Sequence, residues 1–175
     1  MDPATSTLCS TATRHGARRR ARLPPSKETT RGTRSITHIR DYDGTTLTTV
    51  YRQYDGYPSG HGADIYRILG SRQVVNGYTD PLRQVNGPGC AAALLVREIK
   101  ERTAGGVYIV KPDTRGMEEE FVYTIGFDNP DLGETGQIHL RVETENGAAL
   151  FDGPLDLFDA DQCQRIAFDM DEEDD

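Results

Sequence analysis

The sequence predicts an α+β fold, a two-layer sandwich in which helices cover one face of a sheet. Two observations favour it. Segments of alternating apolar residues, typical of strands, flank two segments with helical spacing. The later strand segments carry a single apolar face, as a sheet covered by helices requires. The expected order is an N-terminal β-hairpin, two helices and then an antiparallel β-meander.

A hairpin and a short helix are expected first. Residues 34–41 and 46–54 are rich in strand-forming residues and flank a typical Asp-Gly turn. Val50 and Tyr51 are strong strand formers on opposite faces, so this part of the sheet is expected to be covered on both sides. Apolar residues at helical spacing, followed by a glycine, predict a helix over residues 63–69.

The strongest helical signal covers residues 88–103. Ala91, Leu95 and Ile99 recur every four residues and give this segment an apolar face. Residues 72–87, just before it, contain two Asn-Gly pairs and are expected to form two short turns, because Asn-Gly readily adopts positive φ.

The second half of the chain is rich in strand signals. Its strand candidates alternate apolar and polar residues or form short apolar runs. They are residues 106–111, 119–127, 137–145 and 148–151. The helix over 88–103 is the expected cover for their apolar face.

Charge divides the chain into three parts. The first 34 residues hold eight basic and two acidic residues, residues 152–175 hold ten acidic residues and one Arg, and the whole chain has a net charge of −8. We therefore predict a disordered basic arm over 1–33, a single domain over 34–168 and a disordered acidic tail over 169–175. The predicted domain and tail are both net negative, which does not favour binding to nucleic-acid phosphates.

The basic arm allows three interpretations. It is a disordered extension, an electrostatic tether to nucleic acid, or an organelle transit peptide rich in Arg, Ser and Thr. A secretory signal is not predicted, because no apolar core follows the basic residues. No other segment approaches the ~20 apolar residues of a membrane helix, so no membrane association is expected.

The cysteines predict neither disulfides nor a metal site. Cys9, Cys90 and Cys163 are isolated in the sequence, and no Cys or His pair has zinc-binding spacing. We expect reduced thiols in a cytoplasmic protein, without a metal or another cofactor.

Residues 51–62 carry the densest set of chemically versatile side chains. Aromatic faces beside an Arg and a Gln can stack on and hydrogen-bond to a planar ligand such as a nucleotide. Glycine-rich helix starts at 60–63 and 86–90 can present backbone N–H groups to a phosphate. The predicted ligand-binding residues are Arg52, Gln53, Tyr54, Asp55, Tyr57, His61, Asn86, Gly87 and Gly89.

Three alternatives stay open for this segment. It can be purely structural, with turns made by its Asp, Pro and Gly residues. It can be catalytic, with Asp55, His61 and Asp64 serving a metal-assisted hydrolase or nuclease. It can also be an exposed aromatic patch of a protein decoy, such as an inhibitor of host defence. The sequence contains no Walker loop, dinucleotide-binding fingerprint or known catalytic motif that would favour an enzyme.

One motif in this segment resembles a known group of proteins. The motif is Tyr-basic-Gln/His-aromatic-Asp-Gly-Tyr-Pro, here Tyr51-Arg52-Gln53-Tyr54-Asp55-Gly56-Tyr57-Pro58, preceded by Thr33-Arg34-Ser35. In these residues the chain resembles small uncharacterised phage and prokaryotic proteins, and the similarity covers about residues 33–110. The resemblance implies a phage or mobile-element origin and a host-cell cytoplasmic location, but no activity.

Together these observations predict a non-enzymatic binding domain. Its ligand would be a small, nucleotide-like molecule or a host protein. Nucleic acid would bind only through the basic arm.

Overall fold

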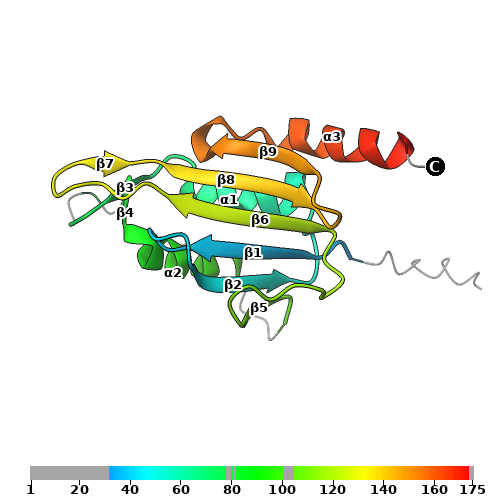
Figure 1. Cartoon of the computed structure of the whole chain (residues 1–175), viewed down its shortest axis with the longest axis horizontal. Coiled ribbons are helices and arrows are strands. Elements are labelled where there is room, and N and C mark those ends of the chain that lie inside the picture. The colour runs from blue at the N-terminus through cyan, green and yellow to red at the C-terminus, as the bar shows by residue number, and fades with distance from the viewer. Residues whose placement is uncertain (1–31, 78–79, 81, 101–104, 174–175) are drawn as a thin grey trace, which may run out of the picture. The chain divides into compact units, whose positions relative to one another are not determined.

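The structure is a computed structural model that describes residues 32–77, 80, 82–100 and 105–173. Helices and strands in these residues form an α+β unit (Figure 1), which confirms the predicted fold class. Almost all of the predicted basic arm lies outside the described residues.

The main sheet has six strands in the order β5-β2-β1-β6-β8-β9. They are β1 (Ser35–Arg40), β2 (Thr46–Arg52), β5 (Val107–Val110), β6 (Phe121–Phe127), β8 (Ile138–Thr144) and β9 (Ala149–Pro154). Strands β1 and β2 form the predicted hairpin, and β6, β8 and β9 form the predicted antiparallel meander. The two halves join through β1 and β6, which are parallel, with Ile36 opposite Val122.

A second sheet replaces the turns that we expected over residues 72–87. Strands β3 (Gln73–Val75) and β4 (Gln84–Asn86) are parallel, and β7 (Thr135–Gly136) pairs with β3 in the antiparallel sense. The expectation was wrong because Val74 and Val85 are buried in the core, and their burial favours extended segments. The third strand comes from a distant part of the sequence, so local patterns do not show it.

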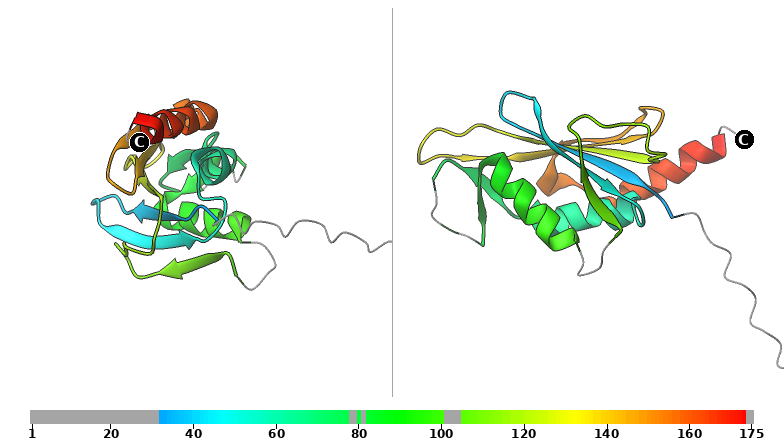
Figure 2. Two further views of the ribbon diagram at one scale, coloured as in Figure 1. Left: turned by 90° about the vertical axis from the view of Figure 1, so that its right-hand side faces the viewer. Right: turned by 90° about the horizontal axis from the view of Figure 1, so that it is seen from below.

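Helices α1 (Ala63–Leu69) and α2 (Gly87–Ile99) pack on the same face of the main sheet (Figure 2). The bounds of α1 match the prediction. Helix α2 starts one residue before the predicted position and ends at Ile99, and residues 101–103 of the predicted helix lie outside the described residues. Leu95 of α2 is fully buried and belongs to the core formed by the helices and the sheet.

A third helix, α3 (Ala160–Glu173), follows a 3₁₀ turn at Leu155–Leu157. This helix was not predicted from the sequence, and residues 169–173, expected in an unstructured tail, are helical. Cys163 and Ala167 lie one helical turn apart and are buried, so they form a narrow apolar stripe among many acidic residues. The stripe anchors the helix beside β9 and Phe158.

Residues 111–120 cover the opposite face of β1 and β2. The backbone N–H of Asp113 donates to the Thr49 hydroxyl at 3.1 Å. The carboxylate of Glu119 accepts hydrogen bonds from two backbone N–H groups of the same segment. Val50 and Tyr51 point to opposite faces and both are buried, as expected for a part of the sheet that is covered on both sides.

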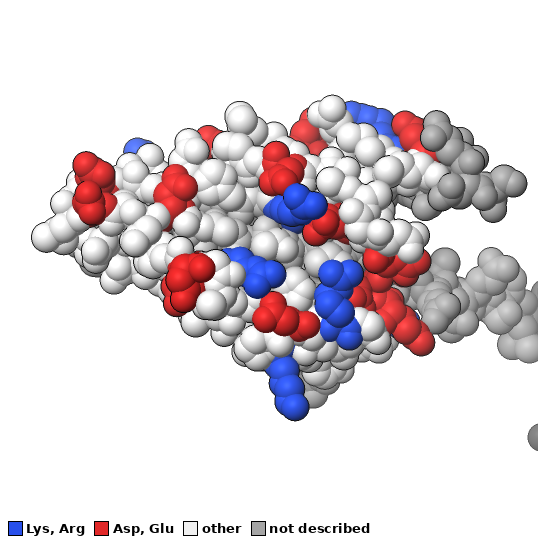
Figure 3. Space-filling view, viewed as in Figure 1, with Lys and Arg blue, Asp and Glu red and all other residues white. Residues whose placement is uncertain are grey.

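The remainder of this face, over β6, β8 and β9, carries interspersed charges of both signs (Figure 3). Arg141 donates to Asp152 and to Glu143, both at 2.8 Å, so much of this charge is paired. No helix in the described parts of the chain has the length and apolar character to cross a membrane.

Candidate functional site

A buried polar cluster fastens segment 51–62 to the sheet. His61 is completely buried, and its Nε2 lies 2.7 Å from the Thr37 hydroxyl on β1. Its Nδ1 lies 3.0 Å from Nη1 of Arg52 on β2. A guanidinium can only donate, so Nδ1 accepts and the Nε2–H donates to Thr37.

The environment of His61 keeps its imidazole neutral. Burial and the neighbouring Arg52 guanidinium lower the pKa of His61 to about 3. The ring also contacts the edge of Tyr123, with centroids 5.0 Å apart. A neutral imidazole with both nitrogens hydrogen-bonded holds the structure together and has no free position for a ligand.

Arg52 is the centre of this cluster. Its Nη1 donates to Asp64 Oδ2 at 2.7 Å, and its Nε donates to the Tyr54 carbonyl at 2.9 Å. Burial raises the pKa of Asp64, but hydrogen bonds from Arg52 and Arg67 outweigh it and leave the pKa below its ordinary value. The resulting ion pair links β2 to α1, so Arg52 supports the fold where we predicted a contact to a ligand.

The Asp-Gly-Tyr-Pro part of the motif packs against the start of β1. A Cβ at Gly56 would lie 2.6 Å from the carbonyl carbon of Arg34, so a side chain at this position would require the backbone to move. The Tyr123 hydroxyl donates to the Gly56 carbonyl at 2.8 Å. Residues Pro58–Gly62 then form a π-helical turn, η1, that leads directly into α1.

The residues of the catalytic alternative do not gather at one point. Asp55 is exposed, whereas His61 is buried and hydrogen-bonded. In the described residues no three His, Cys, Asp or Glu side chains are placed to share a metal ion. The arrangement therefore does not support a metal-assisted reaction through Asp55, His61 and Asp64.

The two predicted halves of the binding site lie at opposite ends of the β1–β2 hairpin. Arg52 is opposite Ser35, at the end where β1 begins. Gly87 lies beside Tyr42, in the turn that joins β1 to β2. Asn86 accepts a hydrogen bond from the backbone of Gly77, and Gly89 is exposed at the start of α2. Asn86, Gly87 and Gly89 therefore do not form one site with segment 51–62.

The remaining predicted residues have separate environments. Gln53 is half-buried, and its backbone N–H donates to the Gly106 carbonyl at 2.8 Å. Tyr54 is exposed.

Tyr57 lines a groove between η1 and α3, which we call the α3 groove. Its volume is about 230 Å³. Its walls include Tyr57, Ser59, Phe121, Gln164, Ala167 and Phe168. The backbone N–H and the hydroxyl of Ser59 both donate to Oε1 of Gln164 at 3.2 Å, which ties the two walls together.

The α3 wall of the groove exposes apolar side chains. Phe168, which lines the groove, is 60% exposed, and Met170, which lines an adjoining hollow, is 38% exposed; both are on the helix that was not predicted from the sequence. The spacing of Cys163 and Ala167 was the signal that could have revealed this helix. A set of exposed apolar side chains beside a groove is typical of a binding surface.

Comparisons with protein families, with curated proteins and with solved structures give no match for this chain. The resemblance to phage proteins and the predicted ligand-binding role of segment 51–62 stay predictions. Any function assigned to this chain therefore depends on the geometry of its own surface.

Proposed function

We propose that the protein is a non-enzymatic binding domain that engages a protein partner through the α3 groove. The observation that carries this proposal is Phe168, a large aromatic side chain exposed beside the half-buried rings of Tyr57 and Phe121. Exposed aromatic residues at the centre of an apolar surface are typical anchors in protein interfaces.

The size of the groove favours a protein segment over a small molecule. Its volume of about 230 Å³ is smaller than the ~300–1,000 Å³ of most small-molecule pockets. The apolar surface continues along α3 to Met170, which lines an adjoining hollow with Ala167 and Phe121. A partner segment can use both hollows, inserting one apolar side chain into each.

Acidic residues indicate the charge of the partner. Glu120 lines both hollows, and Glu145 lines the second. A segment with apolar anchors flanked by Lys or Arg complements this surface, because interfaces match opposite charges. The resemblance to phage proteins implies that this partner is a host protein.

Selection of peptides from a random library against the full chain tests this function. We expect the selected peptides to share an apolar anchor with flanking basic residues. Phe168→Ser should weaken their binding at least tenfold, a change of about 1.4 kcal/mol.

Leu132→Ser is the matched control, because Leu132 is 83% exposed in the β6–β7 connection and lies outside the groove. It should leave binding unchanged. Peptides that bind wild-type protein and the Phe168→Ser variant equally would show that the α3 groove is not the interface.

A further inference from the structure

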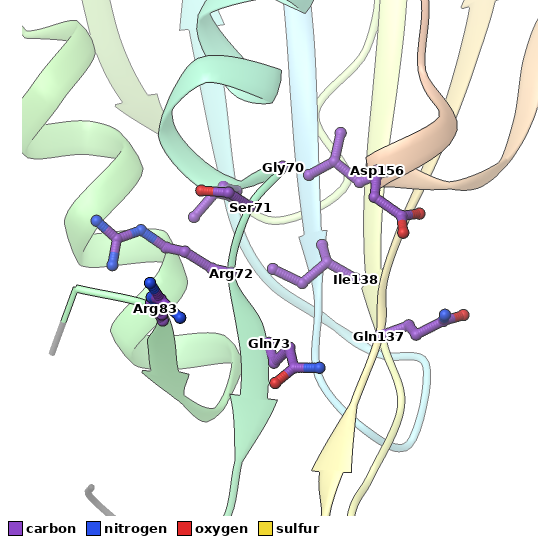
Figure 4. A pocket seen from close by; sticks show the side chains of 10 residues that line it. Gly70, Ser71, Arg72, Gln73, Arg83, Gln137, Ile138 and Asp156 are labelled. Carbon is purple, nitrogen blue, oxygen red and sulfur yellow. The ribbon is translucent and has the colours of Figure 1, made fainter. Parts of the chain in front are cut away.

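A further concavity lies between the main sheet and the second sheet (Figure 4). Its volume is about 420 Å³, which falls in the range typical of small-molecule sites. Its polar lining residues are Ser71, Arg72, Gln73, Arg83, Gln137 and Asp156. We call this concavity the inter-sheet cleft, and none of the residues predicted from the sequence to bind a ligand lines it.

The cleft has an apolar floor. Leu69 at the end of α1, Ile138 at the start of β8 and Leu155 in the 3₁₀ turn line it, and all three are buried. Apolar surface with a few polar groups around it is the usual composition of a ligand site. The floor offers a contact surface for a carbon ring, and the polar walls can orient it.

The two walls carry opposite charges. Figure 4 shows Arg83 on the side of β3 and β4 and Asp156 on the opposite side with Gln137, while the Arg72 guanidinium points away from the cleft towards α2. Arg72 is held in place through its Nε, which donates to the Ile68 carbonyl at 2.9 Å. The Gln73 amide lies between the two walls, where it can both donate and accept a hydrogen bond.

Arg83 is the cation best placed to meet a ligand. Its side chain is exposed, and it makes no ion pair with any described residue. Its backbone carbonyl accepts from the Gln73 N–H at 2.9 Å, so the β3–β4 pairing holds its main chain. A guanidinium on a fixed backbone, with no ion-pair partner among the described residues, is suited to an incoming anion.

We propose that the inter-sheet cleft binds a small phosphate monoester with a hydroxyl-bearing body. The exposed guanidinium of Arg83 matches a phosphate monoester, which carries a charge of about −1.5 to −2 at neutral pH. The carboxylate of Asp156 on the other wall accepts hydrogen bonds from hydroxyl groups. Nucleoside monophosphates and sugar phosphates share this chemistry.

Isothermal titration calorimetry on the full chain tests the proposal with three probes. They are a nucleoside 5′-monophosphate, a hexose 6-phosphate and inorganic phosphate. At least one monoester should bind, and more tightly than inorganic phosphate, because only the monoesters reach Asp156. If only the nucleotide binds, the apolar floor contacts its base. If only the hexose phosphate binds, the floor contacts the sugar ring.

Two variants locate the binding in the cleft. Arg83→Gln should weaken the monoester at least tenfold. Asp156→Asn should weaken the monoester but leave the affinity for inorganic phosphate unchanged. Both side chains are exposed, so the variants should fold, and their thermal unfolding checks this.

Arg141→Gln is the control for general attraction of anions, because Arg141 lies on β8 outside the cleft. It should bind the monoester like the wild type, and so should Phe168→Ser, since the cleft is independent of the α3 groove. The proposal is overturned if no probe binds at millimolar concentration, if Arg83→Gln has no effect, or if Arg141→Gln weakens binding equally.

Discussion

Lowering the pH from about 7.5 to about 5 should destabilise the protein through His61. The pKa of this buried imidazole is about 3 in the folded protein, because burial and the Arg52 guanidinium disfavour its charged form, against 6.5 for an exposed histidine. Between these values the unfolded chain binds a proton that the folded chain does not. The stabilisation is therefore complete above about pH 6.5 and falls as the pH drops below it.

The size of the effect follows from the difference in pKa. Each pH unit below 6.5 removes about 1.4 kcal/mol of unfolding free energy, so the loss at about pH 5 is roughly 2 kcal/mol. Protonation would place an Nδ1–H against the Arg52 guanidinium, and two donors cannot bond to each other. Asp64 contributes little in this range, because its pKa lies below its ordinary value.

The measurement needs a chain in which His61 is the sole histidine. Burial also lowers the pKa of His38, which would add a change of the same sign. Replacing His15, His38 and His139 by Gln leaves one of the four histidines. Urea unfolding of this variant at the two pH values should show the loss of roughly 2 kcal/mol.

An NMR titration of the His61 ring gives an independent measurement, since the imidazole should stay neutral throughout this range. Equal unfolding free energies at the two pH values, or a titration midpoint near 6.5, would refute the buried, Arg52-bonded state of His61.

Three further outcomes are expected. Leu95→Ala should lower the free energy of unfolding by about 2–5 kcal/mol in urea titrations, because Leu95 is fully buried, and a loss below about 1 kcal/mol would contradict its place in the core. Gly56→Ala should lower the Tm, because its Cβ would lie 2.6 Å from a backbone carbon, whereas Gly105→Ala should not, because the nearest atom to its Cβ would be the Tyr108 hydroxyl at 3.7 Å. In the native protein Cys163 should resist thiol reagents, since burial raises its pKa to about 12, while the exposed Cys90 should react; mass spectrometry distinguishes the two.

Elements with a strong local pattern could be predicted from the sequence. Helix α1 has the predicted bounds because Ile65 and Leu69 lie one turn apart and Gly70 follows them. The β1–β2 hairpin was predictable for the same reason, since its turn residues lie between two strand-forming runs.

The second sheet depends on long-range pairing, which local patterns do not contain. Strands β3 and β4 have only three residues each, and they are strands because their valines reach a shared core. Helix α3 was hidden by its acidic composition. Its buried stripe is only one residue wide per turn, so charged residues dominate its pattern.

The candidate site shows a different limit. The sequence identified segment 51–62 by the types of its side chains, but side-chain type does not give direction. Arg52 and His61 turn inward to bond with each other, and Tyr57 turns towards α3. No sequence pattern indicated the inter-sheet cleft, because its polar residues come from four separate stretches of the chain.

The parallel pairing of β1 with β6 has a consequence for synthesis on the ribosome. Strand β1 is made early, yet one of its edges is filled only when the residues opposite it, such as Phe121, have been made. Until then the hairpin exposes an apolar face and an open edge, which are the features that promote aggregation of nascent chains. The main sheet therefore closes late, and fragments that end before β6 should depend on chaperones to stay in solution.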